Sequence, residues 1–383
     1  MARELMQDQN LITGDEQKEL LEKRIKNAER VLRDLLKVKA GEKVAFVTDK
    51  NEYSTDQELI SILKQILERD KIDFSELVAD DEKTTEAELF KAVRGHDLVW
   101  ISWGMEETDI NFDKLSGSIT EKQGRMLFAP GLKAEHLDDG SALTEDKEEL
   151  DCRLAKMEAK LKDVAGFHIT SVYGTDLKIK MMPGKRKWQK ENGELNPGSW
   201  GNLPGGDIFA VPDEENINGV MVLPILTEEV AKHQGVDEFV RLEIRGGKIA
   251  KIDGGKSAEK LRKYLQKNSK YEENPESVIQ ITDIGFGANS KAKPMVAKES
   301  GRYTDTPNPS VEAFNHLGTM HIGTGSSQFD IDGVEGHTVS DIHLDFVLPR
   351  NGLTVNAFYS QEDFKKGKNG ERLIDEGRWR MID

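Results

Sequence analysis

The sequence contains a single cysteine, Cys152, among its 383 residues. One cysteine excludes an intrachain disulfide, and we therefore expect a reducing compartment. The sequence also lacks a run of about 18 apolar residues, which a membrane-spanning helix would need. Its first residues, MARELMQDQNLITGDEQKEL, hold no apolar segment of the length found in signal peptides. These absences predict a cytoplasmic protein with no membrane partner.

Positive charge is also scarce. Lysine and arginine number 54 against 70 aspartate and glutamate residues, and the formal net charge is -16. A surface of this sign repels phosphate backbones, so we expect no nucleic-acid partner. No G-x-G-x-x-G and no G-x-x-x-x-G-K-[ST] follows an apolar strand, and a nucleotide site is therefore not predicted.

The first part of the chain alternates amphipathic helices with short apolar strands. The expected helices are 15–36, 55–70 and 84–95, and the expected strands are 43–49, 97–103 and 125–131. Thr55 and Glu58 stand in capping-box register at the start of the second helix. Such alternation is typical of a mostly parallel sheet covered by helices. We therefore predict an α/β domain over residues 1–164, with an open, mostly parallel sheet and flanking helices.

The pattern changes after a long helix expected at 144–165. Short alternating strands follow, separated by Gly, Pro and Asn. FVRLEIRGGKIAKI indicates a hairpin, because Gly246 and Gly247 separate two alternating runs as a two-residue turn requires. We predict a strand-rich α+β domain over residues 165–383, and it carries the candidate site.

The stretch SDIHLDFVLPR, residues 340–350, combines an apolar face with a polar one. As a strand it places Ile342, Leu344, Phe346 and Leu348 on one face and Asp341, His343, Asp345 and Val347 on the other. The backbones of His343 and Asp345 would lie about 6–7 Å apart, so both side chains can reach one ion.

Three more segments place a ligand-type side chain beside glycine. They are NLPGGDIFAVP with Asp207, ITDIGFGAN with Asp283 and GTMHIGTGSS with His321. Glycine beside a ligand lets the backbone approach a crowded site closely. Zinc, manganese and iron take imidazole nitrogen and carboxylate oxygen. The four segments together predict a divalent-metal site formed by Asp207, Asp283, His321, His343 and Asp345.

Four neighbouring features have ordinary structural interpretations. His316 and His337 lie in loop-like segments and are expected at the surface. Glu312 fits either an acceptor for a ligating histidine or an exposed carboxylate at a helix start. The basic run 185–187 is expected to be a solvated loop.

The order NLPGGDIFAVP, ITDIGFGAN, GTMHIGTG and DIHLDFVL resembles the metal-dependent aminopeptidase T/S-like family, the thermophilic metallo-aminopeptidases. It also resembles the leucyl-aminopeptidase-like proteins around them, with the 2,5-dihydroxypyridine dioxygenase branch. LKVKAGEKVAFVTD and HITSVYGTDLKIKM look like the family's first strand and its T-x-x-x-G-T-D-L segment. The resemblance runs from about residue 28 to the C-terminus, and it implies a homodimeric exopeptidase with two metal ions in the second domain.

Carried over by motif, the resemblance implies metal ligands at Asp207, Asp283, His321, His343 and Asp345. Asp207 or Asp283 would also act catalytically, by shuttling the proton of a metal-activated water. Both positions are glutamates in the family, so the aspartates here have shorter reach. The family tyrosine is missing as well, because its place falls at Gln328.

Three functions are compatible with these residues. The preferred one is an aminopeptidase-like hydrolase that removes N-terminal residues from peptides, with one or two ions of zinc, cobalt or manganese. The alternative is a ring-cleaving dioxygenase acting on a small molecule, with Fe(II) held by His321, His343 and Asp345. The third is a degenerate member of the fold that binds a ligand or partner without turnover.

Overall fold

The computed structural model describes residues 14–52, 54–105, 110–224, 239–293, 312–328, 333–334 and 336–380. The chain divides into two compact units. One takes Met1–Gly104, Thr108–Thr144 and Leu195–Trp200, and the other takes Met105–Glu107, Glu145–Glu194 and Gly201–Asp383. None of the helices in the described ranges is long and apolar enough to span a membrane.

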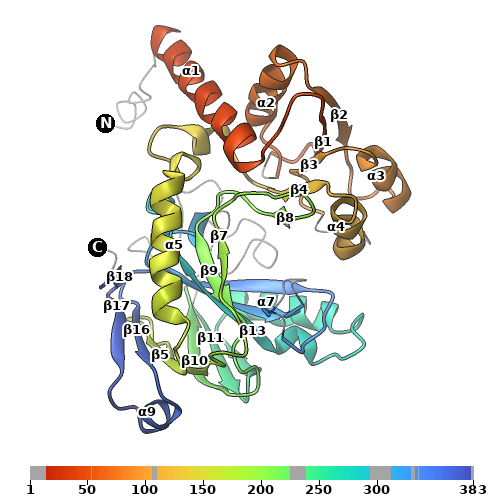
Figure 1. Cartoon of the computed structure of the whole chain (residues 1–383). Helices are drawn as coiled ribbons and strands as arrows, with labels where there is room; N and C mark the ends of the chain where they lie inside the picture. Colours follow the sequence, from red (N-terminus) through yellow and green to blue (C-terminus); the bar gives the residue numbers. More distant parts are fainter. Residues whose placement is uncertain are drawn as a thin grey trace, which may run out of the picture. The chain divides into compact units, whose positions relative to one another are not determined.

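The first unit is built on a sheet with the strand order β2-β1-β3-β4-β8 (Figure 1). The pairs β1–β2, β1–β3 and β3–β4 are all parallel. The strands are β1 (Lys43–Thr48), β2 (Asp73–Val78), β3 (Leu98–Ile101), β4 (Arg125–Phe128) and β8 (Trp200–Gly201). The helices are α1 (Gly14–Arg30), η1 (Val31–Leu35), α2 (Gln57–Arg69), α3 (Glu86–Val93), α4 (Phe112–Thr120), η2 (Ala134–Leu137) and η3 (Ala142–Thr144). Helices α2, α3 and α4 connect successive parallel strands. Helices α2 and α3 correspond to the helices expected at 55–70 and 84–95, whereas α4 and β2 have no counterpart in the prediction.

One helix start differs from the prediction. Asp56 caps α2, because its side chain accepts a hydrogen bond from the backbone N–H of Leu59 at 2.9 Å. Thr55 is engaged elsewhere, since its hydroxyl accepts from the backbone N–H of Asp49. The capping box expected at Thr55 is therefore wrong.

The second unit contains two antiparallel sheets. The larger has the order β12-β11-β10-β6-β5-β16-β17-β18 and the smaller has the order β15-β14-β13-β9-β7. The larger sheet consists of β5 (Gly166–Thr170), β6 (Asp176–Lys180), β10 (Ile217–Leu223), β11 (Val240–Arg245), β12 (Lys248–Asp253), β16 (Thr354–Phe358), β17 (Glu371–Asp375) and β18 (Arg378–Trp379). The smaller consists of β7 (Gln189–Glu191), β9 (Asp207–Ala210), β13 (Ile281–Gly287), β14 (Met320–Gly325) and β15 (His343–Leu348). The helices are α5 (Lys147–Leu161), α7 (Lys256–Asn268), η4 (Ser277–Ile279) and α9 (Gln361–Lys366).

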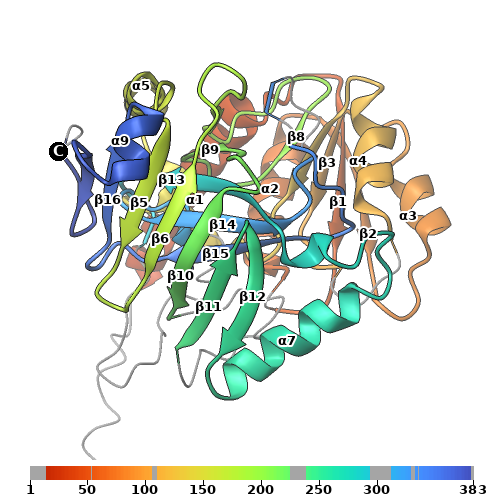
Figure 2. The same cartoon turned by 90° about the horizontal axis from the view of Figure 1, so that it is seen from below.

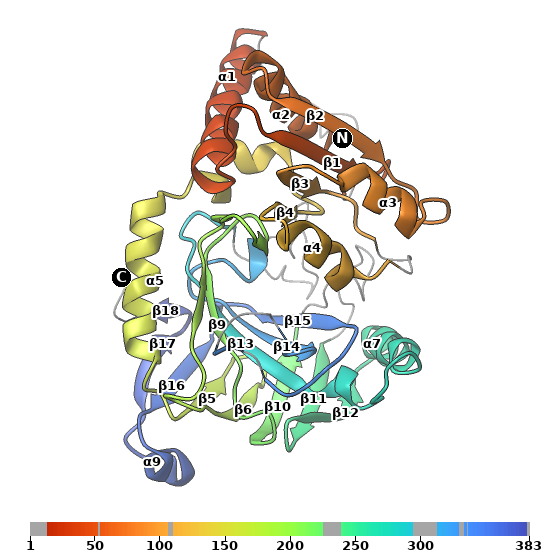
Figure 3. The ribbon, with the colours of Figure 1, turned by 45° about the vertical axis from the view of Figure 1, so that its right-hand side comes forward.

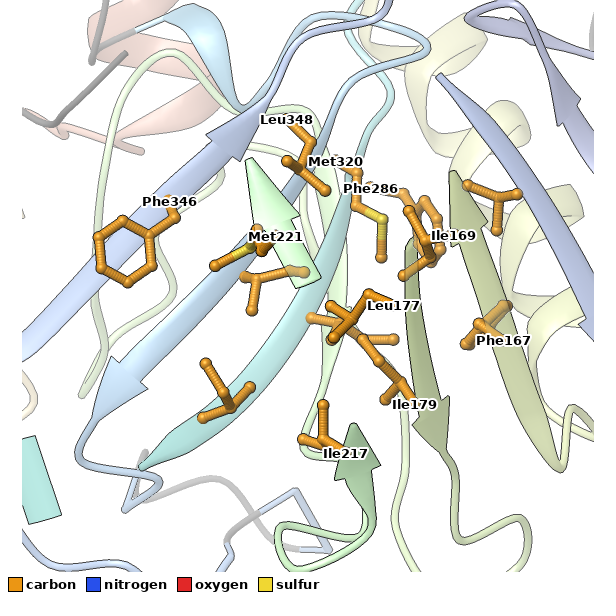
Figure 4. Packing of buried hydrophobic residues seen from close by; sticks show 14 of the residues in the cluster. Phe167, Ile169, Leu177, Ile179, Ile217, Met221, Phe286, Met320, Phe346 and Leu348 are labelled. Carbon is orange, nitrogen blue, oxygen red and sulfur yellow. The ribbon is translucent and has the colours of Figure 1, made fainter. Parts of the chain in front are cut away.

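The two sheets form the layers of a sandwich (Figures 2 and 3). One continuous apolar core lies between them, and it includes Phe167, Ile179 and Met221 from the larger sheet. Phe286 and Phe346 come from the smaller sheet (Figure 4). The core draws on both sheets because strands such as β6 and β15 place alternate apolar residues on the face that meets the other sheet.

Helix α5 belongs to this second unit. Its buried residues Leu150, Leu154, Met157 and Leu161 are part of the same core. This packing explains why the division of the chain falls after Thr144, ahead of the boundary expected at residue 164. A helix joins the unit against which its apolar face is buried.

The hairpin expected in the second half is confirmed. β11 and β12 pair antiparallel, and the turn residues Gly246 and Gly247 have φ values of 56° and 78°. Both values lie in the left-handed region that a two-residue hairpin turn of this type requires.

Candidate metal centre

The ligand-type side chains of the smaller sheet share one face. Asp283 of β13 lies opposite Gly323 of β14, and Gly323 lies opposite Asp345 of β15. His343 stands two residues before Asp345, and His321 two residues before Gly323. Alternate residues of a strand point to the same side, so these four side chains project from a common face.

The two-faced strand predicted at 340–350 is confirmed. Leu344, Phe346 and Leu348 are each 1% exposed and belong to the sandwich core. Figure 4 labels Phe346 and Leu348. His343 and Asp345 alternate with them along β15. The polar face is therefore the one that points away from the larger sheet.

The four side chains form one compact cluster. Asp283, His321 and Asp345 each offer a ligand atom within 4.8 Å of the other two. Nε2 of His343 lies 3.1 Å from Oδ2 of Asp283 and 3.4 Å from Oδ1 of Asp345. Imidazole nitrogen and carboxylate oxygen are the donors that zinc, manganese and iron accept.

Two glycines make room for the cluster. A Cβ atom at Gly323 would overlap the carboxylate of Asp283 and would lie 2.8 Å from its Cγ atom. A Cβ atom at Gly285 would overlap the imidazole of His321 in the same way. The missing side chains thus provide the space that sequence reasoning expected glycine to provide.

Backbone groups orient two of the ligand-type side chains. The N–H of Gly323 donates to Oδ1 of Asp283 at 2.7 Å, which leaves Oδ2 toward His343. The carbonyl of Ser326 lies 2.9 Å from Nδ1 of His343. A carbonyl only accepts, so Nδ1 carries the proton that it donates, and Nε2 is the atom presented to the carboxylates.

His321 is a buried member of the cluster. The residue is 5% exposed, and its Nδ1 has no hydrogen-bond partner in the part of the chain that the structure describes. Phe314 packs against the imidazole edge to face, with ring centroids 5.6 Å apart. A buried imidazole nitrogen without a partner is costly unless it meets a ligand such as a metal ion.

The charges of the cluster are strongly coupled. Burial would lower the pKa of His343, but Asp283 and Asp345 outweigh it and raise this pKa well above its usual value. Burial would raise the pKa of Asp345, but the charge and hydrogen bond of His343 hold it at about 2. Without a metal ion, the carboxylates of Asp283 and Asp345 therefore favour the protonated form of His343.

Asp207 and a further carboxylate extend the same face. Asp207 is 4% exposed and lies opposite Gly287 of β13 on one side and Glu191 of β7 on the other. Burial, followed by the charges of Glu191, Asp345 and Asp283, raises the pKa of Asp207 well above its usual value. Burial and the charge of Asp345 raise the pKa of Glu191 to about 7. Two neighbouring buried carboxylates tend to retain a proton, because ionising both would place two negative charges close together away from water.

Glu191 is the residue that sequence reasoning missed. It ends the three-residue strand β7, within WQKEN, and this stretch has no apolar alternation that would indicate a strand. Its place beside Asp207 results from the pairing of β7 with β9. No local signal in the sequence predicts that pairing.

The interpretations of His316, Glu312 and the basic run 185–187 also change. His316, expected at the surface, is 5% exposed, and Glu312, 1% exposed, accepts a hydrogen bond from the backbone N–H of Lys293. Arg186, expected in a solvated loop, binds Oε2 of Glu214 at 3.0 Å. Gln328, at the place of the family tyrosine, donates its side-chain amide to the carbonyl of Gly336 at 2.8 Å.

Comparison with known proteins gives a family match over most of the chain. The family model of 2,5-dihydroxypyridine 5,6-dioxygenase, NicX, matches residues 24–356. Over 142 residues the chain is 32% identical to the 2,5-dihydroxypyridine 5,6-dioxygenase of Pseudomonas putida. This alignment covers 37% of the chain and 39% of that enzyme, well under two thirds of its length.

Two solved structures share the fold. The 2,5-dihydroxypyridine dioxygenase from Pseudomonas putida KT2440 matches with a TM-score of 0.65 at 20% identity, over 94% of this chain and 98% of that one. Wild-type AmpT from Thermus thermophilus matches with a TM-score of 0.62 at 16% identity, over 94% of this chain and 99% of AmpT. The predicted fold class, a parallel-sheet domain joined to an antiparallel, strand-rich domain, is therefore confirmed.

Proposed function

Because the chain belongs to the 2,5-dihydroxypyridine 5,6-dioxygenase family, NicX, we propose that it is a metal-dependent oxygenase that opens the ring of a small dihydroxylated heteroaromatic compound. One observation carries the proposal: the family match over residues 24–356 includes the whole cluster of Asp283, His321, His343 and Asp345. The match supports the dioxygenase alternative of the sequence analysis more than the preferred aminopeptidase.

The residues present fit a divalent ion. His321, His343 and Asp345 would supply two imidazoles and one carboxylate to the ion, and Asp283 lies beside them. Nδ1 of His321, which has no hydrogen-bond partner among the described residues, and the space left by Gly285 agree with this assignment. Ferrous iron bound there would supply the reactivity toward dioxygen that ring cleavage needs.

Residues of the chain orient the ligand-type side chains and provide carboxylates for proton transfer. Ser326 orients His343 through its carbonyl, and the N–H of Gly323 orients Asp283. Asp207 and Glu191 face each other on the neighbouring strands. In the proposed reaction a carboxylate of this pair takes the proton from a substrate hydroxyl and returns it to the product, because the raised pKa of both groups makes their carboxylates stronger bases.

The test is oxygen consumption. Protein reconstituted with Fe(II) under anaerobic conditions is mixed with 2,5-dihydroxypyridine in air-saturated buffer, and oxygen uptake and a product that has gained two oxygen atoms are expected. His343→Gln should abolish both, while Asp341→Asn, on the same segment but outside the cluster, should retain them. Absence of uptake with 2,5-dihydroxypyridine and with related dihydroxylated heteroaromatics would refute the proposal.

A second candidate is the aminopeptidase-type hydrolase preferred by the sequence analysis. Glu191 and Asp207 favour it, because two carboxylates beside the cluster could help to hold a second ion. Release of p-nitroaniline from leucyl-p-nitroanilide by the zinc-, cobalt- or manganese-loaded protein, with two ions per chain, would support this function. The cytoplasmic location and the homodimer remain predictions, which cell fractionation and light scattering can test.

A further inference from the structure

Glu214 is a buried carboxylate outside the metal cluster. It lies between β9 and β10 and is 1% exposed. Burying an ionised carboxylate is expensive unless several donors surround it. The structure provides those donors, and most of them come from the connection between β14 and β15.

Both oxygens of Glu214 are occupied. Oε1 accepts from the hydroxyl of Ser327 at 2.8 Å, and from the hydroxyl and backbone N–H of Thr338 at 2.7 and 3.2 Å. Oε2 accepts from the backbone N–H of His337 at 3.1 Å and from Nη2 of Arg186 at 3.0 Å, and Nδ1 of His337 lies 2.8 Å away. Only an ionised carboxylate accepts from so many donors at once.

Two described parts of the connection, residues 326–328 and 336–338, pass close to this carboxylate. A Cβ atom at Gly336 would lie 2.6 Å from Oε2 of Glu214, so the chain passes the carboxylate more closely than a side chain would allow. The N–H of Ser327 donates to the carbonyl of Thr338 at 3.0 Å, and the N–H of Gly336 donates to the carbonyl of Ser327 at 2.9 Å. Glu214 thus forms hydrogen bonds both with Ser327, after β14, and with residues 337–338, before β15.

The residue next to Ser327 contacts the candidate metal ligand. The carbonyl of Ser326 accepts the Nδ1 proton of His343 at 2.9 Å, and the N–H of Ser326 donates to the carbonyl of Ile342 at 2.7 Å. The hydrogen bond to this carbonyl keeps the proton on Nδ1 and sets the direction in which the ring points. Ser327, the neighbour of Ser326, is in turn hydrogen-bonded to Glu214.

We propose that Glu214 is a positioning residue: by fixing Ser327 it holds the Ser326 carbonyl against Nδ1 of His343 and so directs Nε2 toward Asp283 and Asp345. The inference rests on the proposed metal centre for its functional meaning, but the orientation of His343 can be measured without any metal. In Glu214→Gln the side-chain amide turns a donor toward groups that already donate. The connection should then shift, and the Ser326 carbonyl with it.

The first measurement uses metal-free protein. The side-chain nitrogen resonances of His343, identified by their absence in His343→Gln, are compared by NMR in wild type and Glu214→Gln. We expect the wild type to show protonated, hydrogen-bonded Nδ1 and the variant to show a change at that nitrogen. The second measurement titrates each protein with Co(II) or Fe(II), and we expect the affinity of Glu214→Gln to be about 10- to 100-fold weaker.

Two further variants keep the test decisive. Ser327→Ala removes one hydroxyl, but the N–H of Thr338 keeps Glu214 as its hydrogen-bond partner, so this variant should fold. It replaces Glu214→Gln if that variant is unstable, and it should show both the change at Nδ1 of His343 and the weaker metal affinity. Glu145→Gln is the matched control, because Glu145 is 5% exposed and accepts from Ser290 and Lys291, in another segment. It should change neither His343 nor metal affinity.

The possible failures are distinguishable. If the wild type binds no metal, the proposed function fails, and the NMR comparison alone decides whether Glu214 orients His343. If the wild type binds metal while Glu214→Gln and Ser327→Ala match it in both measurements, the inference is overturned and the proposed function stands.

Discussion

His321 occupies the space that Gly285 leaves on the neighbouring strand. Gly285 and His321 are cross-strand partners, and a Cβ atom at residue 285 would lie 2.8 Å from Nδ1 of His321 and would overlap Cε1 and Nε2. The imidazole is thus placed by an absent side chain. We expect Gly285→Ala to displace His321 and to weaken metal binding at least about 10-fold, measured by titration with Co(II).

A matched substitution separates this effect from general strain. Gly117 lies within α4, and a Cβ atom there would meet nothing closer than 4.0 Å. Gly117→Ala should bind metal as the wild type does and should be slightly more stable, by about 0.5–1 kcal/mol. Unchanged metal affinity in Gly285→Ala would show that His321 is not a ligand.

Asp345 is expected to be the carboxylate on which the centre depends most. Asp345→Asn preserves shape but removes the charge that neighbours His343 and His321. We expect metal affinity to fall at least about 100-fold, measured by elemental analysis after dialysis against one equivalent of metal. Asp341→Asn, on the same segment, is the control and should bind normally. Equal metal content in both variants would rule out a role for Asp345.

Glu191 should give the metal-free protein a characteristic pH dependence. Burial and the charge of Asp345 raise its pKa from 4.5 to about 7. The folded state therefore binds this proton more tightly than the unfolded chain does. The contribution of the protonated Glu191 to the free energy of unfolding is complete at a pH below 4.5, the pKa in the unfolded chain, and is lost as the pH rises toward 7. Glu191→Gln should lessen this loss, which we expect to be on the order of 2 kcal/mol. Urea unfolding in the presence of a chelator, at about pH 5 and about pH 8, measures it.

The control for Glu191 is a carboxylate outside the cluster. Glu158 forms an ion pair with Lys190, the neighbour of Glu191 on β7. Glu158→Gln should keep the wild-type pH dependence. Parallel curves for Glu191→Gln and the wild type would mean that Glu191 does not share the proton of the site.

His316 should give the protein a loss of stability at acidic pH, opposite in direction to the effect of Glu191. Burial lowers the pKa of His316 to about 4, and the charge of Arg350 adds a smaller effect in the same direction. The hydrogen bond from Nδ1 to the carbonyl of Ala292 acts in the opposite direction but is outweighed. Nη1 of Arg350 donates to Nε2 at 3.0 Å, which requires a neutral ring. Stability is therefore complete above the unfolded pKa of about 6.5 and is lost as the pH falls toward 4.

Acidification from about pH 7 to about pH 5 should lower the free energy of unfolding by on the order of 2 kcal/mol through His316. His316→Gln should remove this part of the loss, because glutamine can accept from Arg350 and donate to Ala292 without titrating. His168→Gln, at a half-exposed histidine paired with Asp176, is the control and should keep the loss assigned to His316. If His316→Gln loses as much stability as the wild type, the buried ring is not the titrating group.

Local patterns predicted much of the fold. The apolar spacing of 55–70 and the alternation in 240–253 correspond to α2 and to the β11–β12 hairpin, because these elements depend on contacts between near neighbours. The edge strand β2 was missed, since DFSELV is largely exposed and shows no buried run. The burial of His316 was also missed, because its partners Ala292 and Arg350 are distant in the sequence.

The sequence by itself determined which residues can ligate and which face of each strand they occupy. His343 and Asp345 share a face because the side-chain period of a strand is two, and this holds in any tertiary structure. Only the tertiary structure decided that β13 lies between β9 and β14, with Gly285 opposite His321 and Glu191 opposite Asp207. Strand order and register follow from burying one apolar face of the whole sheet against another, and no single segment contains that information.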